Sequence, residues 1–141
     1  MSVNPRLKVS LAQISPVWLD RAATLEKVAD SIQQAGAAGS QLIAFGEALV
    51  PGYPFWPELT NGAQFDSALQ KDLFAHYSSQ AVDIEAGDLQ VLCGLASQHS
   101  IAVYLGCIER PADRGGQSGD GIIALFRAHI GRRGQHPEGL A

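Results

Sequence analysis

Hydrophobic positions in the first fifty residues change spacing twice, which predicts a strand, a helix and a second strand in that order. Residues 7–14 place alternate side chains on two faces, as a β-strand does. Asp20 stands where a helix N-cap is expected, and apolar residues follow at the three-to-four spacing of a helix as far as Gly36. Residues 42–45 are apolar without alternation, which is typical of a strand buried on both faces. The sequence therefore predicts a βαβ unit and an α/β fold.

Two further helices and one strand are predicted after a proline-rich loop. Pro51, Pro54 and Pro57 are expected to exclude regular helix or central strand and to hold residues 51–57 as an ordered loop. Apolar residues return at helical spacing in two later segments and at strand spacing in a third: residues 66–82, 87–99 and 101–108.

Residues 115–141 are predicted to form an irregular tail rich in glycine and arginine. Residues 122–126 could make one more strand, whereas residues 127–141 predict no element. The segment Gly115–Gly119 lacks the GK[ST] ending and the following helix of a phosphate-binding loop, so a plain loop is expected.

Composition and charge narrow the classes of function. The chain has 141 residues and a formal net charge of −4, and its basic residues are scattered, which argues against nucleic acid as a partner. No apolar run is long enough to span a bilayer, and residues 1–6 lack the apolar core of a secretory signal, so a cytoplasmic location is expected. Cys93 and Cys107 lack the spacing of a metal site, and neither a metal nor a cofactor is expected.

Glu47 is the candidate catalytic residue. It follows the apolar run 42–45, at the carboxyl end of a predicted strand, where open α/β sheets bind their ligands. Nearby aromatic residues, Tyr53 and Trp56 among them, are expected to exclude water from the carboxylate and so favour its neutral form, which suits a general base near neutral pH. The residues alone leave open that Glu47 is a cap, an ion-pair partner or a solvated side chain.

The segment from Gly39 to Pro54 resembles the first sequence signature of the nitrilases and cyanide hydratases, a branch of the carbon–nitrogen hydrolase superfamily. The matching positions are Gly39, Leu42, Ile43, Phe45, Glu47, Val50, Gly52, Tyr53 and Pro54. The Phe55-Trp56 continuation looks like nitrilases rather than the more distant amidases, and residues 9–17 and 104–110 are also similar to the family. The resemblance covers residues 7–114, which we expect to be the amino-terminal part of such a domain.

The resemblance implies an α-β-β-α sandwich and a Glu-Lys-Cys mechanism in which Glu47 is the proton acceptor. Tyr53 and Trp56, in the loop after Glu47, are the candidate substrate-binding residues. The substrate would be an organic nitrile or cyanide, and the intact family members associate into homo-oligomers.

The family's lysine and cysteine motifs have no counterpart here. The last lysine is Lys71, within a predicted helix, and the basic residues of the tail form no copy of the motif: His129, Arg132, Arg133 and His136. Cys93 is expected to be a core residue, and nothing near Cys107 in the sequence would lower the pKa of its thiol.

We therefore expect a partial sandwich, truncated after the third or fourth strand, that is inactive alone and leaves an apolar sheet face exposed. An alternative is a non-catalytic module that associates with intact nitrilase subunits. A flavodoxin-like ligand binder ranks last, because no glycine-rich phosphate loop follows the first strand.

Overall fold

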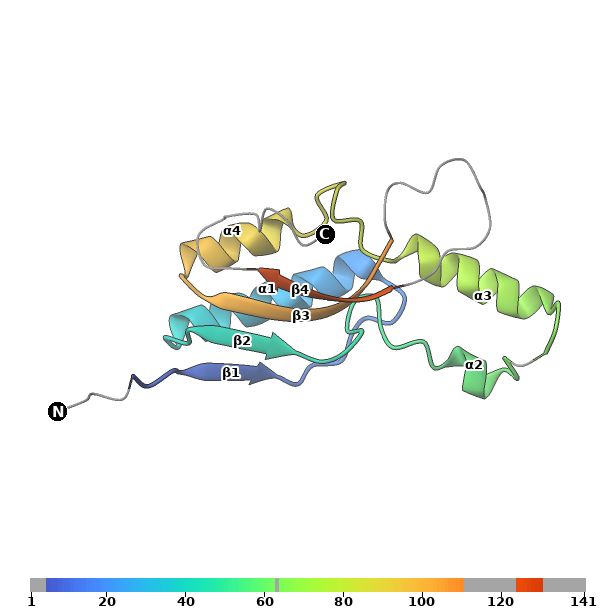
Figure 1. The fold of residues 1–141 in the computed structure, drawn as a ribbon, viewed down its shortest axis with the longest axis horizontal. Coiled ribbons are helices and arrows are strands. Elements are labelled where there is room, and N and C mark those ends of the chain that lie inside the picture. The colour runs from blue at the N-terminus through green and yellow to red at the C-terminus, as the bar shows by residue number, and fades with distance from the viewer. Residues whose placement is uncertain (1–4, 63, 111–123, 131–141) are drawn as a thin grey trace.

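The computed structural model describes residues 5–62, 64–110 and 124–130. Within them the chain forms a four-stranded sheet with the order β1-β2-β3-β4 (Figure 1). The first three strands run parallel, and the fourth is antiparallel to β3. Their bounds are Val9–Ala12 for β1, Leu42–Phe45 for β2, Ala102–Glu109 for β3 and Ala124–Ile130 for β4.

The described helices fall into two groups (Figure 1). Helices α1 (Arg21–Ala37) and α4 (Gln90–Gln98) pack on one face of the sheet. Helices α2 (Trp56–Leu59) and α3 (Ala68–Ser79) lie beyond the carboxyl ends of β1 and β2. The strand–helix–strand opening and the α/β class are thus confirmed.

Strand register decides which side chains form the core. Ile43 and Phe45 of β2 share a face with alternate residues of β3, and this face packs against α1 and α4. The buried members of this cluster on β3 and the two helices are Val103, Leu105, Cys107, Val28, Ile32, Leu92 and Ala96.

The opposite face of the sheet is apolar, exposed along β1 and half-buried on β2 and β3. Two rows run across it in register: Val9, Leu42 and Ala102, then Leu11, Ala44 and Tyr104. On the edge strand β1, 81% of Leu11 and 42% of Val9 is exposed. The expected exposed sheet face is therefore present along β1, and the neighbouring strands are only half-buried on this side.

A second, smaller core cluster attaches α3 and the proline-rich loop to the sheet. Its buried residues are Leu19, Ala48, Trp56, Tyr77, Ala81 and Ile108. Val82 also pairs with Glu109, and its amide donates to the Ile108 carbonyl at 2.8 Å, so the chain after α3 extends the parallel sheet briefly.

Two expectations about secondary structure were wrong. The proline-rich loop contains the short helix α2, because Pro57 lies in its first turn, where an amide has no helical partner to lose. Strand β4 continues to Ile130, past residue 126, because its backbone pairs with β3 along almost the whole of that strand. Residues 111–123 and 131–141, which include the glycine-rich segment and most of the predicted tail, lie outside the described residues. Among the described helices, none has the length and apolar character needed to cross a membrane.

Candidate active site

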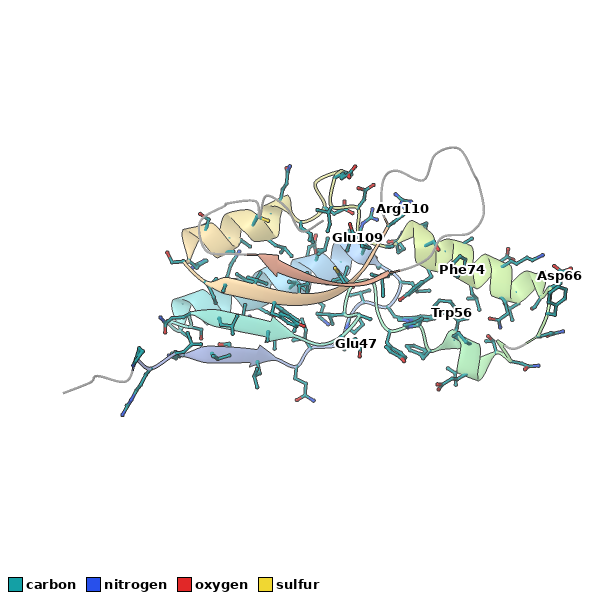
Figure 2. The ribbon with its side chains drawn as sticks, viewed as in Figure 1. Glu47, Trp56, Asp66, Phe74, Glu109 and Arg110 are labelled. Carbon is teal, nitrogen blue, oxygen red and sulfur yellow. The ribbon has the colours of Figure 1, made fainter. Side chains whose placement is uncertain are left out.

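Glu47 lies in a bulge between two segments that both pair with β3. Strand β2 ends at Phe45, the chain leaves the sheet, and Val50 returns to it. The Val50 amide donates to the Gly106 carbonyl at 3.3 Å, and the Ile108 amide donates to the Val50 carbonyl at 2.8 Å. This arrangement places Glu47 at the carboxyl edge of the sheet, where the sequence predicted it (Figure 2).

Gly106 of β3 allows the bulge to lie directly against the strand. A Cβ atom at this position would lie 2.2 Å from the Gly46 carbonyl oxygen and 2.8 Å from the Glu47 Cα. No side chain fits there without moving the backbone. Ala48 also adopts a left-handed backbone, with φ of 50°, which turns the chain back toward the sheet. The backbone position of Glu47 is thus set by close packing.

The expected dehydration of Glu47 was wrong for this chain, because the side chain is exposed. Two aromatic residues that were expected to cover it, Phe55 and Trp56, pack elsewhere, and Tyr53 is exposed. Phe55 stacks on Trp18, with ring centroids 4.6 Å apart, and Trp56 packs on Tyr77 at 4.7 Å. Among the described residues, no group forms a hydrogen bond with the Glu47 carboxylate. The carboxylate is open to water and to an incoming group.

The two predicted substrate contacts lie in different environments. Trp56 is 6% exposed and belongs to the second core cluster, so its ring serves packing in this structure. Tyr53 is 55% exposed and remains available to a ligand. Figure 2 shows Trp56 at the start of α2, beyond the end of β2 near which Glu47 lies.

Residues 46–56 are here named the Glu47 loop. Three consecutive carbonyls of this loop accept hydrogen bonds from residues outside it. The Leu19 amide donates to the Pro51 carbonyl at 2.9 Å. The next two bonds come from side chains: Tyr77 Oη to the Gly52 carbonyl at 3.1 Å, and Trp18 Nε1 to the Tyr53 carbonyl at 3.2 Å. Trp18 and Tyr77 were not predicted as site residues. Their aromatic character was visible, but no periodicity links them to the loop.

Neither cysteine is placed to act as a nucleophile. Cys107 is fully buried in β3, and burial together with the charge of Glu109 raises the pKa of its thiol to about 11. Cys93 packs against the main core, and burial also raises the pKa of its thiol. Because the thiolate is the reactive form, both thiols are deactivated by the fold. No metal-binding group of three or more His, Cys, Asp or Glu side chains occurs in the described part of the chain.

Comparison with known proteins relates this arrangement to a family. The model of the carbon–nitrogen hydrolase family matches residues 8–129, beyond the expected limit at Arg114. An arylacetonitrilase from Aspergillus niger is 34% identical over 110 residues, which cover 78% of this chain and 31% of that protein. A bromoxynil-specific nitrilase from Klebsiella pneumoniae subsp. ozaenae is 34% identical over 108 residues, which cover 77% of this chain and 30% of that protein.

Among solved structures, an amidase from Nesterenkonia sp. aligns with a TM-score of 0.44 and 23% identity, over 72% of this chain and 32% of that one. The chain thus spans about a third of the length of the curated relatives it matches. Since the family model covers most of the sequence, this chain belongs to the carbon–nitrogen hydrolase family.

Proposed function

We propose that this chain provides the general base of a nitrilase-type hydrolase, and that the base is Glu47. One observation carries the proposal: the packed bulge opposite Gly106 presents an accessible carboxylate at the carboxyl edge of the sheet. Family membership and the similarity to proteins named nitrilases support a nitrile as the substrate.

In the proposed reaction, a cysteine thiol loses its proton to Glu47, and the thiolate attacks the nitrile carbon to form a thioimidate. Water then adds, ammonia leaves, and hydrolysis of the thioester releases the carboxylic acid and restores the thiol. Glu47 would receive and return protons in these steps, while a lysine stabilises the tetrahedral species.

The thiol and the lysine of this mechanism would come from polypeptide other than the residues described here. Cys107 is buried within the sheet, and burial raises the pKa of its thiol. We therefore expect the purified 141-residue chain to release no ammonia from benzonitrile, aliphatic nitriles or cyanide. Turnover that Cys107→Ala abolishes would contradict this assignment.

Complementation tests the role of Glu47 directly. The full chain would be co-expressed with the remaining two thirds of the Aspergillus niger arylacetonitrilase, and ammonia release from phenylacetonitrile would be measured. We expect activity with the wild-type chain and a loss of at least about a hundredfold with Glu47→Gln, which keeps the shape but cannot accept the proton.

Glu26→Gln is the matched control. Glu26 is exposed on α1, so this substitution makes the same change of charge away from the bulge. Equal activity of the Glu47→Gln and wild-type complexes would overturn the proposal. Loss of ammonia release in both the Glu47→Gln and the Glu26→Gln complexes would point to a general effect of charge. That result would also count against the proposed role of Glu47.

A further inference from the structure

The geometry points to Trp18 and Tyr77 as positioning residues that hold the Glu47 loop in its working conformation. This inference rests on the proposed function and extends it to residues outside the family-like signature. Trp18 lies between β1 and α1, and Tyr77 lies on α3. Two segments far apart in sequence therefore converge on the loop that carries Glu47 and Tyr53.

The first reason is the hydrogen-bond pattern. Adjacent carbonyls, those of Gly52 and Tyr53, accept from Tyr77 Oη and Trp18 Nε1. Backbone carbonyls in a loop have no ladder partner, so bonds from side chains fix a conformation that the loop alone would not hold.

The second reason is that both donor rings pack against other residues, Tyr77 in the core and Trp18, which is 38% exposed, at the surface. Tyr77 is 1% exposed and its ring lies against Trp56. The Trp18 ring stacks on Phe55 and lies against Gly52, where an added Cβ would be 2.6 Å from Trp18 Cδ1. Gly52 has φ of +128°, so its backbone and its lack of a side chain both suit this close approach.

The third reason is that, among the described residues, none contacts the Glu47 carboxylate through a hydrogen bond or ion pair. The position of this side chain therefore depends on the backbone of the loop that carries it. Tyr77 binds the carbonyl of Gly52, and the amide of the same residue donates to the Ala48 carbonyl at 3.1 Å. Ala48 follows Glu47 directly, so the hydrogen bond from Tyr77 is linked through Gly52 to the backbone beside the base. Release of Gly52 or Tyr53 would therefore displace both the base and the exposed Tyr53 ring.

The first measurement is amide hydrogen exchange by mass spectrometry on the full 141-residue chain. Tyr77→Phe and Trp18→Phe each remove one donor and keep an aromatic ring. We expect exchange in residues 46–56 to rise about tenfold in each variant, with peptides from α1 and α4 unchanged. Ser79→Ala is the control, because it removes a hydroxyl donor from the same helix, one that bonds to the His76 carbonyl and does not contact the loop.

The second measurement is the KM for phenylacetonitrile in the complemented complex. We expect both variants to raise KM about fivefold and Ser79→Ala to leave it unchanged, because displacement of Tyr53 weakens binding of the substrate. A variant that merely misfolds would reduce the amount of active complex and leave KM as it was. The change in KM therefore separates positioning from a general loss of structure.

Unchanged exchange in the Glu47 loop in both variants would overturn the inference whatever the complex does. Faster amide exchange with unchanged KM and kcat would also overturn the inference. The hydrogen bonds from Trp18 and Tyr77 would then hold the loop but have no effect on the reaction. If the wild-type complex releases no ammonia, the proposed function fails and the catalytic role of these residues fails with it. The exchange data would still show whether the two donors hold the loop, so the two failures are distinguishable.

Discussion

At residue 106, the absence of a side chain lets β3 touch the backbone that carries the candidate base. We predict that Gly106→Ala lowers the free energy of unfolding by about 1–3 kcal/mol, because the new methyl group would meet backbone atoms of Gly46 and Glu47 that cannot move as a flexible side chain could. Urea denaturation would measure the change.

Gly94→Ala provides a control of opposite sign. Gly94 is exposed in the interior of α4, and an added Cβ there meets nothing within 4 Å. Alanine should therefore raise the free energy of unfolding by about 0.5–1 kcal/mol through its better helix propensity. Equal effects of the two substitutions would show that close packing at Gly106 does not fix the bulge.

Two buried acids, Cys107 and Tyr77, predict a loss of stability in alkali. Burial raises the pKa of the Cys107 thiol from 9.0 to about 11, and it raises the pKa of Tyr77 above 10.0. The folded state keeps these protons at pH values where the unfolded chain releases them. The stabilisation is therefore complete below pH 9 and falls as the pH rises toward 11.

Urea titrations between pH 8 and pH 11 would measure this dependence. Cys107→Ala should flatten the slope above pH 9, where one retained proton contributes up to about 1.4 kcal/mol per pH unit. The substitution also leaves a small cavity, but that cost is independent of pH and does not alter the slope. An unchanged slope would contradict the raised thiol pKa.

Sequence predicted where Glu47 lies but not how exposed it is. Its position follows from the apolar run 42–45. This run forms a short buried strand, and the polar residue that follows it lies at the carboxyl edge of the sheet. Its exposure depends on where Phe55 and Trp56 turn, and they turn toward Trp18 and Tyr77. Contacts between such distant parts of the chain leave no periodic signal in a single sequence.

At the scale of elements, local signals located most of the helices and strands. The Asp20 cap is confirmed, since its side chain accepts from the Ala23 amide at 2.9 Å. Proline misled the prediction at Pro57, which lies in the first turn of a helix instead of excluding one. Strand β4 was underestimated because its length is set by pairing with β3, which residues 127–130 do not reveal by themselves.

Arg21 joins the start of α1 to the end of α3 and to the segment before α4. Its Nη1 donates to the carbonyls of Ser79 and Ala81 at 3.3 and 2.6 Å, and its Nε lies 3.2 Å from an oxygen of Asp88. We predict that Arg21→Met lowers the free energy of unfolding by about 1–3 kcal/mol, because it leaves partly buried acceptors without a donor.

Lys71→Met is the matched control for Arg21. Lys71 pairs with Asp66 at the surface, and both side chains are 67% exposed, so its loss should change the free energy of unfolding by less than about 0.5 kcal/mol. Thermal or urea denaturation of both variants gives the comparison. A cost for Arg21→Met as small as that for Lys71→Met would show that this link between α1 and α3 contributes little to stability.

At the scale of the whole molecule, the two faces of the sheet differ in how far helices cover them. One face of the sheet is covered by α1 and α4, and the other presents apolar side chains on three neighbouring strands. Because β1 is also the edge strand of the described sheet, its exposed side chains lie beside backbone groups that have no neighbouring strand among the described residues. Such a surface favours association of the chain and binding of hydrophobic dyes.

Leu11→Glu tests this consequence, because Leu11 is the most exposed side chain of that face, at 81%, and a carboxylate there interrupts the apolar rows. We expect at least about a twofold decrease in ANS fluorescence and a lower average mass by analytical ultracentrifugation at the same concentration. Leu59→Glu is the control: Leu59 is 75% exposed on α2, away from the sheet, and the substitution adds the same charge. If both variants reduce dye binding and association equally, net charge is the cause. If only Leu11→Glu does so, the uncovered sheet face governs how this chain behaves in solution.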